Sequence, residues 1–135
     1  MNRVAVVSII MRVVLGIIFI FHGVDKFQMG IGNVESWFIL LGIPGFVAYF
    51  VAAVELVGGV MLIVGLFTRY VSALIVIVLT GAILTAKLSV GLLGNGQMAG
   101  YELDLGFILI LLYLIVAEQT PLSVDHYIQS KRSKS

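Results

Sequence analysis

Residues 51–65 read VAAVELVGGVMLIVG and contain one charged side chain, Glu55, in an otherwise apolar run. A lone carboxylate is costly on a surface that faces lipid, and ionisable groups in membrane helices usually face the bundle interior in pairs. The stretch therefore predicts a membrane helix whose Glu55 face is turned towards a polar partner on another helix.

The composition of the whole chain is that of an integral membrane protein. Of its 135 residues, 61% are hydrophobic and 11% are charged, whereas soluble domains carry about 25% charged residues. The formal net charge is +1, which indicates no nucleic-acid partner. The chain has no cysteine, which excludes disulfides, thiol catalysis and cysteine-ligated metals. Its two histidines, His22 and His126, lie on different segments, so we expect no bis-histidine haem.

A membrane-spanning helix needs roughly 20 mostly apolar residues, and we find four such stretches. We therefore predict an all-α membrane protein with four transmembrane helices in an antiparallel bundle and a short interfacial helix in the first loop. The first helix is interrupted by Arg12 and is interpreted as retained rather than as a signal peptide. The transmembrane helices are expected at residues 4–24, 46–67, 70–88 and 102–117, and the interfacial helix at residues 34–41.

We expect one transmembrane domain over residues 1–120 and a polar basic tail over residues 121–135. Positive residues are enriched on the cytoplasmic side of membrane proteins, and their distribution here predicts that both termini are cytoplasmic. The tail is expected to be a frayed, solvated end rather than a lipid-binding segment. One side of the predicted bundle holds Arg3, Arg69, Lys131, Arg132 and Lys134, and the other holds Lys26 and Lys87.

Helical depth suggests a partner for Glu55. At 1.5 Å per residue, Arg12 lies about 12 Å and Glu55 about 18 Å from the cytoplasmic face. We therefore expect an Arg12–Glu55 ion pair between the first two membrane helices, which Gly16 and Gly59 allow to approach closely. The pair either fixes helix register alone or belongs to a functional site, and the sequence leaves both roles open.

A second group of polar residues gathers at the outer ends of the predicted helices. His22 either shuttles a proton or only forms hydrogen bonds at the interface, and acidic residues at a helix start also suit the helix dipole. The spacing of the group is not specific for a metal, so we predict no metal site. The group comprises His22, Asp25, Lys26, Lys87, Glu102 and Asp104.

Two segments resemble the signatures of the DoxX family. RVVLGIIFIFHGVDKF, residues 12–27, is similar to its Arg-x3-Gly stretch ending in HG-x2-K, and ELVGGVMLIVGLFTR, residues 55–69, is similar to E-x2-GG followed by GL-x-TR. The resemblance covers nearly the whole chain. It implies a four-helix, multi-pass protein of the bacterial cytoplasmic (inner) membrane, an oxidoreductase activity, and an association with quinone, catechol or thiol stress. The matching residues are Arg12, Gly16, His22, Gly23, Lys26, Glu55, Gly58, Gly59, Gly65, Thr68 and Arg69.

From the residues and the resemblance together, we expect an oxidoreductase component that acts on or with quinones. A quinone or small aromatic molecule is the expected ligand, and no resident cofactor is assigned. Electrons would come from a redox protein partner, a bound cofactor or the substrate, and a homo-oligomer is compatible with the sequence. The candidate catalytic residues are Glu55, Arg12 and His22, and the candidate substrate-binding residues are Lys26, Phe19, Lys87, Asp104 and Glu102.

Two other function classes fit the same sequence. The first is a non-enzymatic membrane scaffold or small-solute binder, which the lack of a cofactor motif favours. The second is a transporter of small aromatic compounds, which four helices would form most readily as an oligomer.

Overall fold

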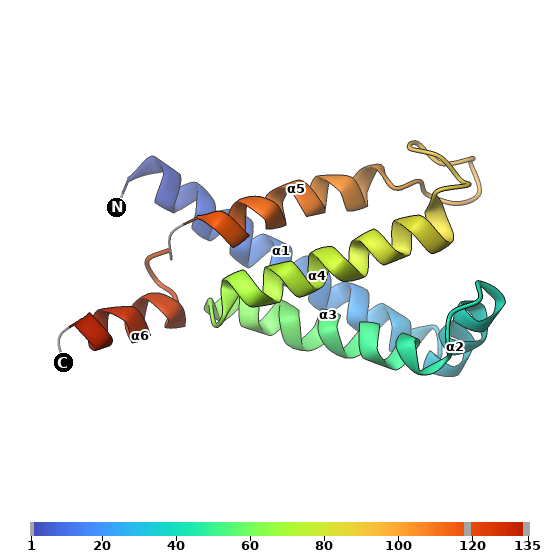
Figure 1. Cartoon of the computed structure of the whole chain (residues 1–135), viewed down its shortest axis with the longest axis horizontal. Helices are drawn as coiled ribbons and strands as arrows, with labels where there is room; N and C mark the ends of the chain where they lie inside the picture. The colour runs from blue at the N-terminus through green and yellow to red at the C-terminus, as the bar shows by residue number, and fades with distance from the viewer. Residues whose placement is uncertain (1, 118–119, 134–135) are drawn as a thin grey trace.

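The computed structural model describes residues 2–117 and 120–133, and these residues form helices and loops without a β-strand (Figure 1). The prediction of an all-helical protein is therefore confirmed. The elements in chain order are α1 (Arg3–Gln28), α2 (Ile31–Leu40), α3 (Phe46–Val64), α4 (Thr68–Ala82), the π-helical turn η1 (Ile83–Lys87), α5 (Glu102–Val116) and α6 (Val124–Ser133).

Three helical stretches are long and apolar enough to cross a membrane: Arg3–Gln28, Phe46–Val64 and Thr68–Lys87. The fourth expected crossing, α5, is equally apolar but has 15 residues. That corresponds to about 22 Å, against a hydrocarbon core of about 30 Å. The short helix expected in the first loop is present as α2.

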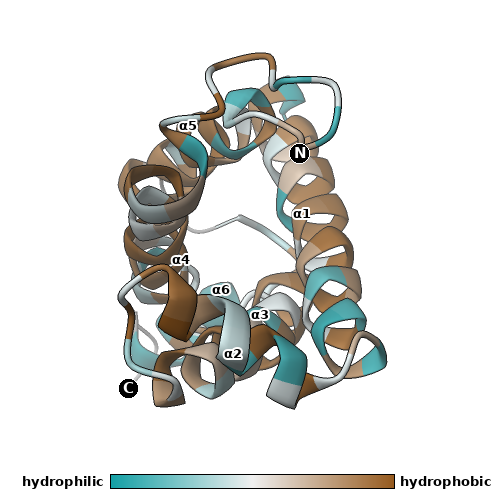
Figure 2. Cartoon of the chain, turned by 90° about the vertical axis from the view of Figure 1, so that its right-hand side faces the viewer, coloured by the Kyte–Doolittle hydropathy of each residue, from teal (hydrophilic) through white to brown (hydrophobic). Residues whose placement is uncertain are grey.

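The four long helices lie in two pairs, which the end-on view in Figure 2 separates. α1 packs mainly along α3, and α4 packs mainly along α5, while the short α3–α4 turn joins the pairs. Phe19, Leu62 and Ile75 are almost fully buried in the shared core. Many large apolar side chains point outward instead, including Phe21 and Ile77. An apolar outer surface suits lipid rather than water.

Two glycines set the distance between α1 and α3. A Cβ atom added at Gly16 would lie 2.6 Å from the carbonyl oxygen of Gly59, and one added at Gly59 would lie 2.6 Å from the carbonyl oxygen of Gly16. Only residues without a side chain allow the two backbones to come this close. The predicted role of Gly16 and Gly59 in helix approach is thus confirmed.

We define two ends of the bundle from Figure 1. The terminal end carries the start of α1, the α3–α4 turn, the end of α5 and α6, and the loop end carries α2, η1 and residues 88–101. The tail does not fray over its described part, because residues 124–133 form α6. The Asp125 carboxylate accepts hydrogen bonds from the amides of Phe67 and Thr68, which holds α6 against the α3–α4 turn. Residues 134–135 lie outside the described part.

We predict that Gly59→Val separates α1 from α3. The added side chain meets the backbone of α1, and overpacking of this kind costs about 1–3 kcal/mol. The temperature of unfolding in mild detergent should fall accordingly. Gly106→Ala in α5 is the matched control, because a Cβ atom at Gly106 meets nothing within 4 Å. Equal unfolding temperatures for the two variants would contradict the assigned contact.

Candidate functional site

Glu55 forms an ion pair with a lysine of α1. The ammonium group of Lys26 donates a hydrogen bond of 2.8 Å to Oε1 of Glu55, and their side chains are 21% and 9% exposed. Removing one partner of so buried a pair leaves a charge without compensation. Glu55 is therefore a paired carboxylate in the interior of the bundle, as the opening stretch of sequence suggested.

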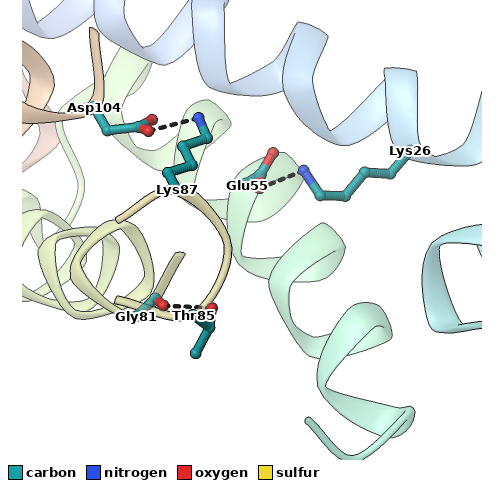
Figure 3. A network of polar contacts seen from close by, with 6 residues as sticks. All are labelled: Lys26, Glu55, Gly81, Thr85, Lys87 and Asp104. Carbon is teal, nitrogen blue, oxygen red and sulfur yellow. Dashed lines mark hydrogen bonds and ion pairs between the residues drawn. The ribbon is translucent and has the colours of Figure 1, made fainter. Parts of the chain in front are cut away.

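A second ion pair joins the other two helices at the same end. Lys87 donates a hydrogen bond of 2.6 Å to Oδ2 of Asp104, and the side chains are 26% and 10% exposed. Lys87 is the last residue of the π-helical turn η1. A π-turn rotates the following side chains relative to a continuous α-helix, and such turns are frequent at functional sites. Figure 3 shows Lys87 reaching from this turn towards α5, where it meets Asp104.

A cluster of aromatic rings connects the two helix pairs beside these charges. The ring of Phe19 lies 5.5 Å from that of Phe107 and 5.9 Å from that of His22, and His22 lies 6.3 Å from Phe107, all between ring centroids. His22 is one helical turn from Lys26, and Phe107 is one turn from Asp104. Both ion pairs therefore lie about one turn from the same three rings. We call Lys26, Glu55, Lys87 and Asp104 the paired-charge cluster.

One oxygen of this cluster has no protein donor. Oε2 of Glu55 is buried and has no hydrogen-bond partner within residues 2–117 and 120–133. A buried acceptor left unpaired costs about 1–3 kcal/mol. Figure 3 shows one oxygen of the Glu55 carboxylate joined to Lys26, while no contact is drawn to the second oxygen. Such an oxygen can accept a hydrogen bond from a small molecule that carries a hydroxyl or amino group.

The comparisons with known proteins agree with this reading of the fold. The family model described as DoxX matches residues 7–88, which run from the second turn of α1 to the end of η1 and include Lys26, Glu55 and Lys87. The chain belongs to the DoxX family. The predicted resemblance is thereby confirmed.

Two relatives extend the similarity over most of the chain. A Bacillus subtilis (strain 168) protein named "Putative oxidoreductase CatD" is 38% identical over 121 residues, covering 90% of this chain and 86% of its own length. A Mycobacterium tuberculosis (strain H37Rv) protein named "Uncharacterized membrane protein Rv3486" is 32% identical over 139 residues, covering 93% of this chain and 82% of its own length. No solved structure gives a significant match.

The prediction that Arg12 forms an ion pair with Glu55 in this DoxX protein is wrong. The guanidinium group of Arg12 donates to the carbonyl oxygens of Leu62, Ile63 and Leu122, over 3.1, 3.2 and 3.0 Å. It thus binds the last turn of α3 at the terminal end, whereas Glu55 pairs with Lys26 towards the loop end. A cation at a helix C-terminus is also favoured by the helix dipole. Arg12 is 1% exposed and is held away from the paired-charge cluster.

Helical depth alone gives the wrong partner for Glu55, because the direction of the side chains also decides which groups meet. Long side chains in a helix lean back towards its N-terminus, so Arg12 extends to the terminal end and Lys26 extends back towards Glu55. The contact of Gly16 with Gly59 fixes the register at which this happens. Gly65 completes the Arg12 site, since its backbone has φ +74° and a Cβ atom there would collide with the guanidinium.

The remaining predicted residues divide into two groups. His22 and Phe19 belong to the ring cluster. Glu102 and Asp25 are exposed, and neither takes part in the two ion pairs found among the described residues. Within the described residues, no group of three His, Asp or Glu side chains gathers closely enough to hold a metal ion. Phe107 was not among the predicted site residues, although its position three residues after Asp104 places both on one helix face.

We predict that Arg12→Gln loosens the terminal end. The variant leaves buried carbonyl oxygens without their charged donor, which should cost about 3 kcal/mol, and it frees Leu122 before α6. The measurements are the unfolding temperature and the rate of protease cleavage within α6. Arg3→Gln is the control, because Arg3 is exposed. If α6 is cleaved at the wild-type rate in both variants, Arg12 does not hold α6 in place.

We also predict strong coupling between Lys26 and Glu55. Lys26→Met and Glu55→Met should each destabilise the protein by about 3 kcal/mol, because each strands a buried charge. The double variant should be nearly as stable as the wild type. Unfolding of all four proteins in mixed detergent gives the coupling free energy, with exposed Asp25→Asn as a control for charge alone. Additive single effects would show that the pair is not coupled.

Proposed function

We propose that this DoxX protein is the membrane component of a quinone-linked oxidoreductase and that it holds a quinone or quinol beside the paired-charge cluster. The oxidoreductase part of the proposal is supported by the name of the Bacillus subtilis relative, "Putative oxidoreductase CatD". The quinol part is supported by the chemistry of the described residues. A stress-related role with quinones, catechols or thiols is the physiological setting that we propose for it.

The observation that carries the proposal is the unpaired Oε2 of Glu55. A carboxylate oxygen only accepts hydrogen bonds, so the ligand that completes the site must donate one. The hydroxyl group of a quinol is such a donor, and the carbonyl group of the oxidised quinone is not. The site should therefore favour the reduced ring.

The neighbouring side chains suit the rest of an aromatic diol. Lys26 and Lys87 are ammonium groups with three donors each, and each uses one in its ion pair. A remaining donor can bind the second ring oxygen. Phe19 and Phe107 are buried beside the charges, and we propose that they form the aromatic wall against the ring of the ligand. His22 is in edge contact with both rings.

Proton transfer is the chemistry that these residues can supply. Conversion of a quinol to a quinone releases two electrons and two protons. Glu55 can accept one proton from the bound hydroxyl, and the imidazole of His22, one helical turn from Lys26, can accept the other. We propose that the two electrons go to a redox protein partner, since the chain has no cysteine with which to accept them.

We also propose an arrangement of the protein in the membrane. We propose that α5 is the fourth crossing, which local thinning of the bilayer accommodates, and that the protein spans the bacterial cytoplasmic membrane. The terminal end would face the cytoplasm, in line with the basic residues of α6. The quinol site would then lie near the outer half of the bilayer. We further propose residues 1–120 as the functional membrane domain.

The test compares a short-tailed benzoquinol with its dimethyl ether, which has the same ring but no hydroxyl donor. Wild-type protein in mild detergent should bind the quinol at least about tenfold more tightly, because the ether leaves a buried acceptor unpaired. Glu55→Gln should lose most of this preference. Asp25→Asn, an exposed carboxylate on α1, should retain it.

Folding of each variant is checked by its unfolding temperature and circular dichroism. Equal affinity of the folded wild type for the quinol and the ether would contradict the proposal. Retention of the full preference by Glu55→Gln would remove Glu55 from the site.

A further inference from the structure

A cavity of about 440 Å³ lies at the terminal end, far from the paired-charge cluster. Its walls come from the first turn of α4, the last turns of α5 and one face of α6, which Figure 1 shows converging at this end. The cavity exists because α6 docks on the α3–α4 turn. The amide of Asp125 donates to the carbonyl oxygen of Gly65, and the Asp125 carboxylate accepts from Phe67 and Thr68.

The charges on the cavity wall favour an anion. Arg69 and Arg132 line it from α4 and α6, and Asp125 is the acidic residue among its described lining residues. The Asp125 carboxylate is already bound by two backbone amides at the start of α4. Arg69 donates its Nε to the carbonyl oxygen of Ile115 over 2.8 Å, which fixes its guanidinium at the cavity. Guanidinium groups bind phosphate oxygens in a bidentate manner.

The other walls suit a molecule that is apolar at one end. Leu114 and Ile128 line the cavity beside the arginines. Phe67 and Tyr70 also line it and are 52% and 72% exposed. Exposed aromatic side chains at the ends of membrane helices lie at the level of the lipid headgroups. The cavity is therefore lined by two arginines and by apolar side chains, and it lies at a level where headgroups are found.

We infer that this cavity binds the phosphate group of an anionic phosphate ester, with the headgroup of an anionic phospholipid as its source. Arg69 and Arg132 hold the phosphate, and Leu114 and Ile128 contact the adjoining apolar part. This gives α6 a role that a frayed tail could not have, since α6 contributes one of the two cations. The site lies at the opposite end of the bundle from Glu55, so it does not depend on the proposed quinol chemistry.

The experiment is native mass spectrometry of the full chain, delipidated in mild detergent and titrated with phosphatidylglycerol or with zwitterionic phosphatidylcholine. The variants are Arg69→Gln, Arg132→Gln and the double variant. Lys131→Gln is the matched control, because it removes one positive charge from α6 outside the cavity, where Lys131 lies over the ring of Tyr127. A parallel titration adds glycerol 3-phosphate as a competitor without acyl chains.

We expect the wild type to prefer phosphatidylglycerol. Its affinity should fall about fivefold in each single variant and about thirtyfold in the double variant, since each substitution removes a direct hydrogen bond to the phosphate, which is worth about 1 kcal/mol. Lys131→Gln should bind as the wild type does. Arg132→Gln keeps the test valid if Arg69→Gln, which also loses its bond to Ile115, does not fold.

Two other results are informative. Full competition by glycerol 3-phosphate would support the phosphate site and identify a soluble ester as its source. Equal affinities for the two lipids, or an equal loss in Lys131→Gln and the double variant, would overturn the inference.

Discussion

The contact of α1 with α3 at Gly16 and Gly59 sets the register on which two charged side chains of α1, Arg12 and Lys26, depend. Because the backbones touch at this point, Lys26 reaches Glu55 on one side of it, and Arg12 reaches the carbonyl oxygens at the end of α3 on the other. A bilayer offers neither charge an alternative partner. The glycine contact therefore lies between the Arg12 site and the Lys26–Glu55 ion pair, and it keeps the two apart along α1.

The second helix pair, α4 and α5, also carries an ion pair, but a π-helical turn rather than a glycine contact positions it. The π-helical turn η1 ends at Lys87 and directs it to Asp104 of α5. Near the charges, the ring of Phe19 on α1 contacts the ring of Phe107 on α5 and so links the two helix pairs. Each helix pair thus carries its own neutral ion pair, and the rings join the two. A ligand beside these rings would contact both helix pairs at once, so its binding would depend on how the two helix pairs are placed relative to each other.

Much of this arrangement could be predicted from the sequence, and the failures have a common cause. Helix positions and the buried face of α1 follow from local periodicity. The burial of Gly16 and the approximate ends of α3 could therefore be predicted. The partner of Glu55 depends on interhelical register and on the direction of long side chains, neither of which is a local property. The same holds for α6, whose order comes from Asp125 binding the turn before α4. The site formed by Arg12, Gly65 and Leu122 joins segments that lie far apart in the sequence, so no local pattern predicts it.

The Arg12 site also constrains the order in which the protein can assemble. Two of the carbonyl acceptors of Arg12 lie 50 and 110 residues later in the chain. At a synthesis rate of about 5–20 residues per second, the first of them is made roughly 3–10 s after Arg12 itself. During that interval α1 carries a guanidinium that has no internal acceptor and must remain near water or headgroups. The arginine is thus buried only after α3 has been inserted, and its last bond, to Leu122, forms when the fold is nearly complete.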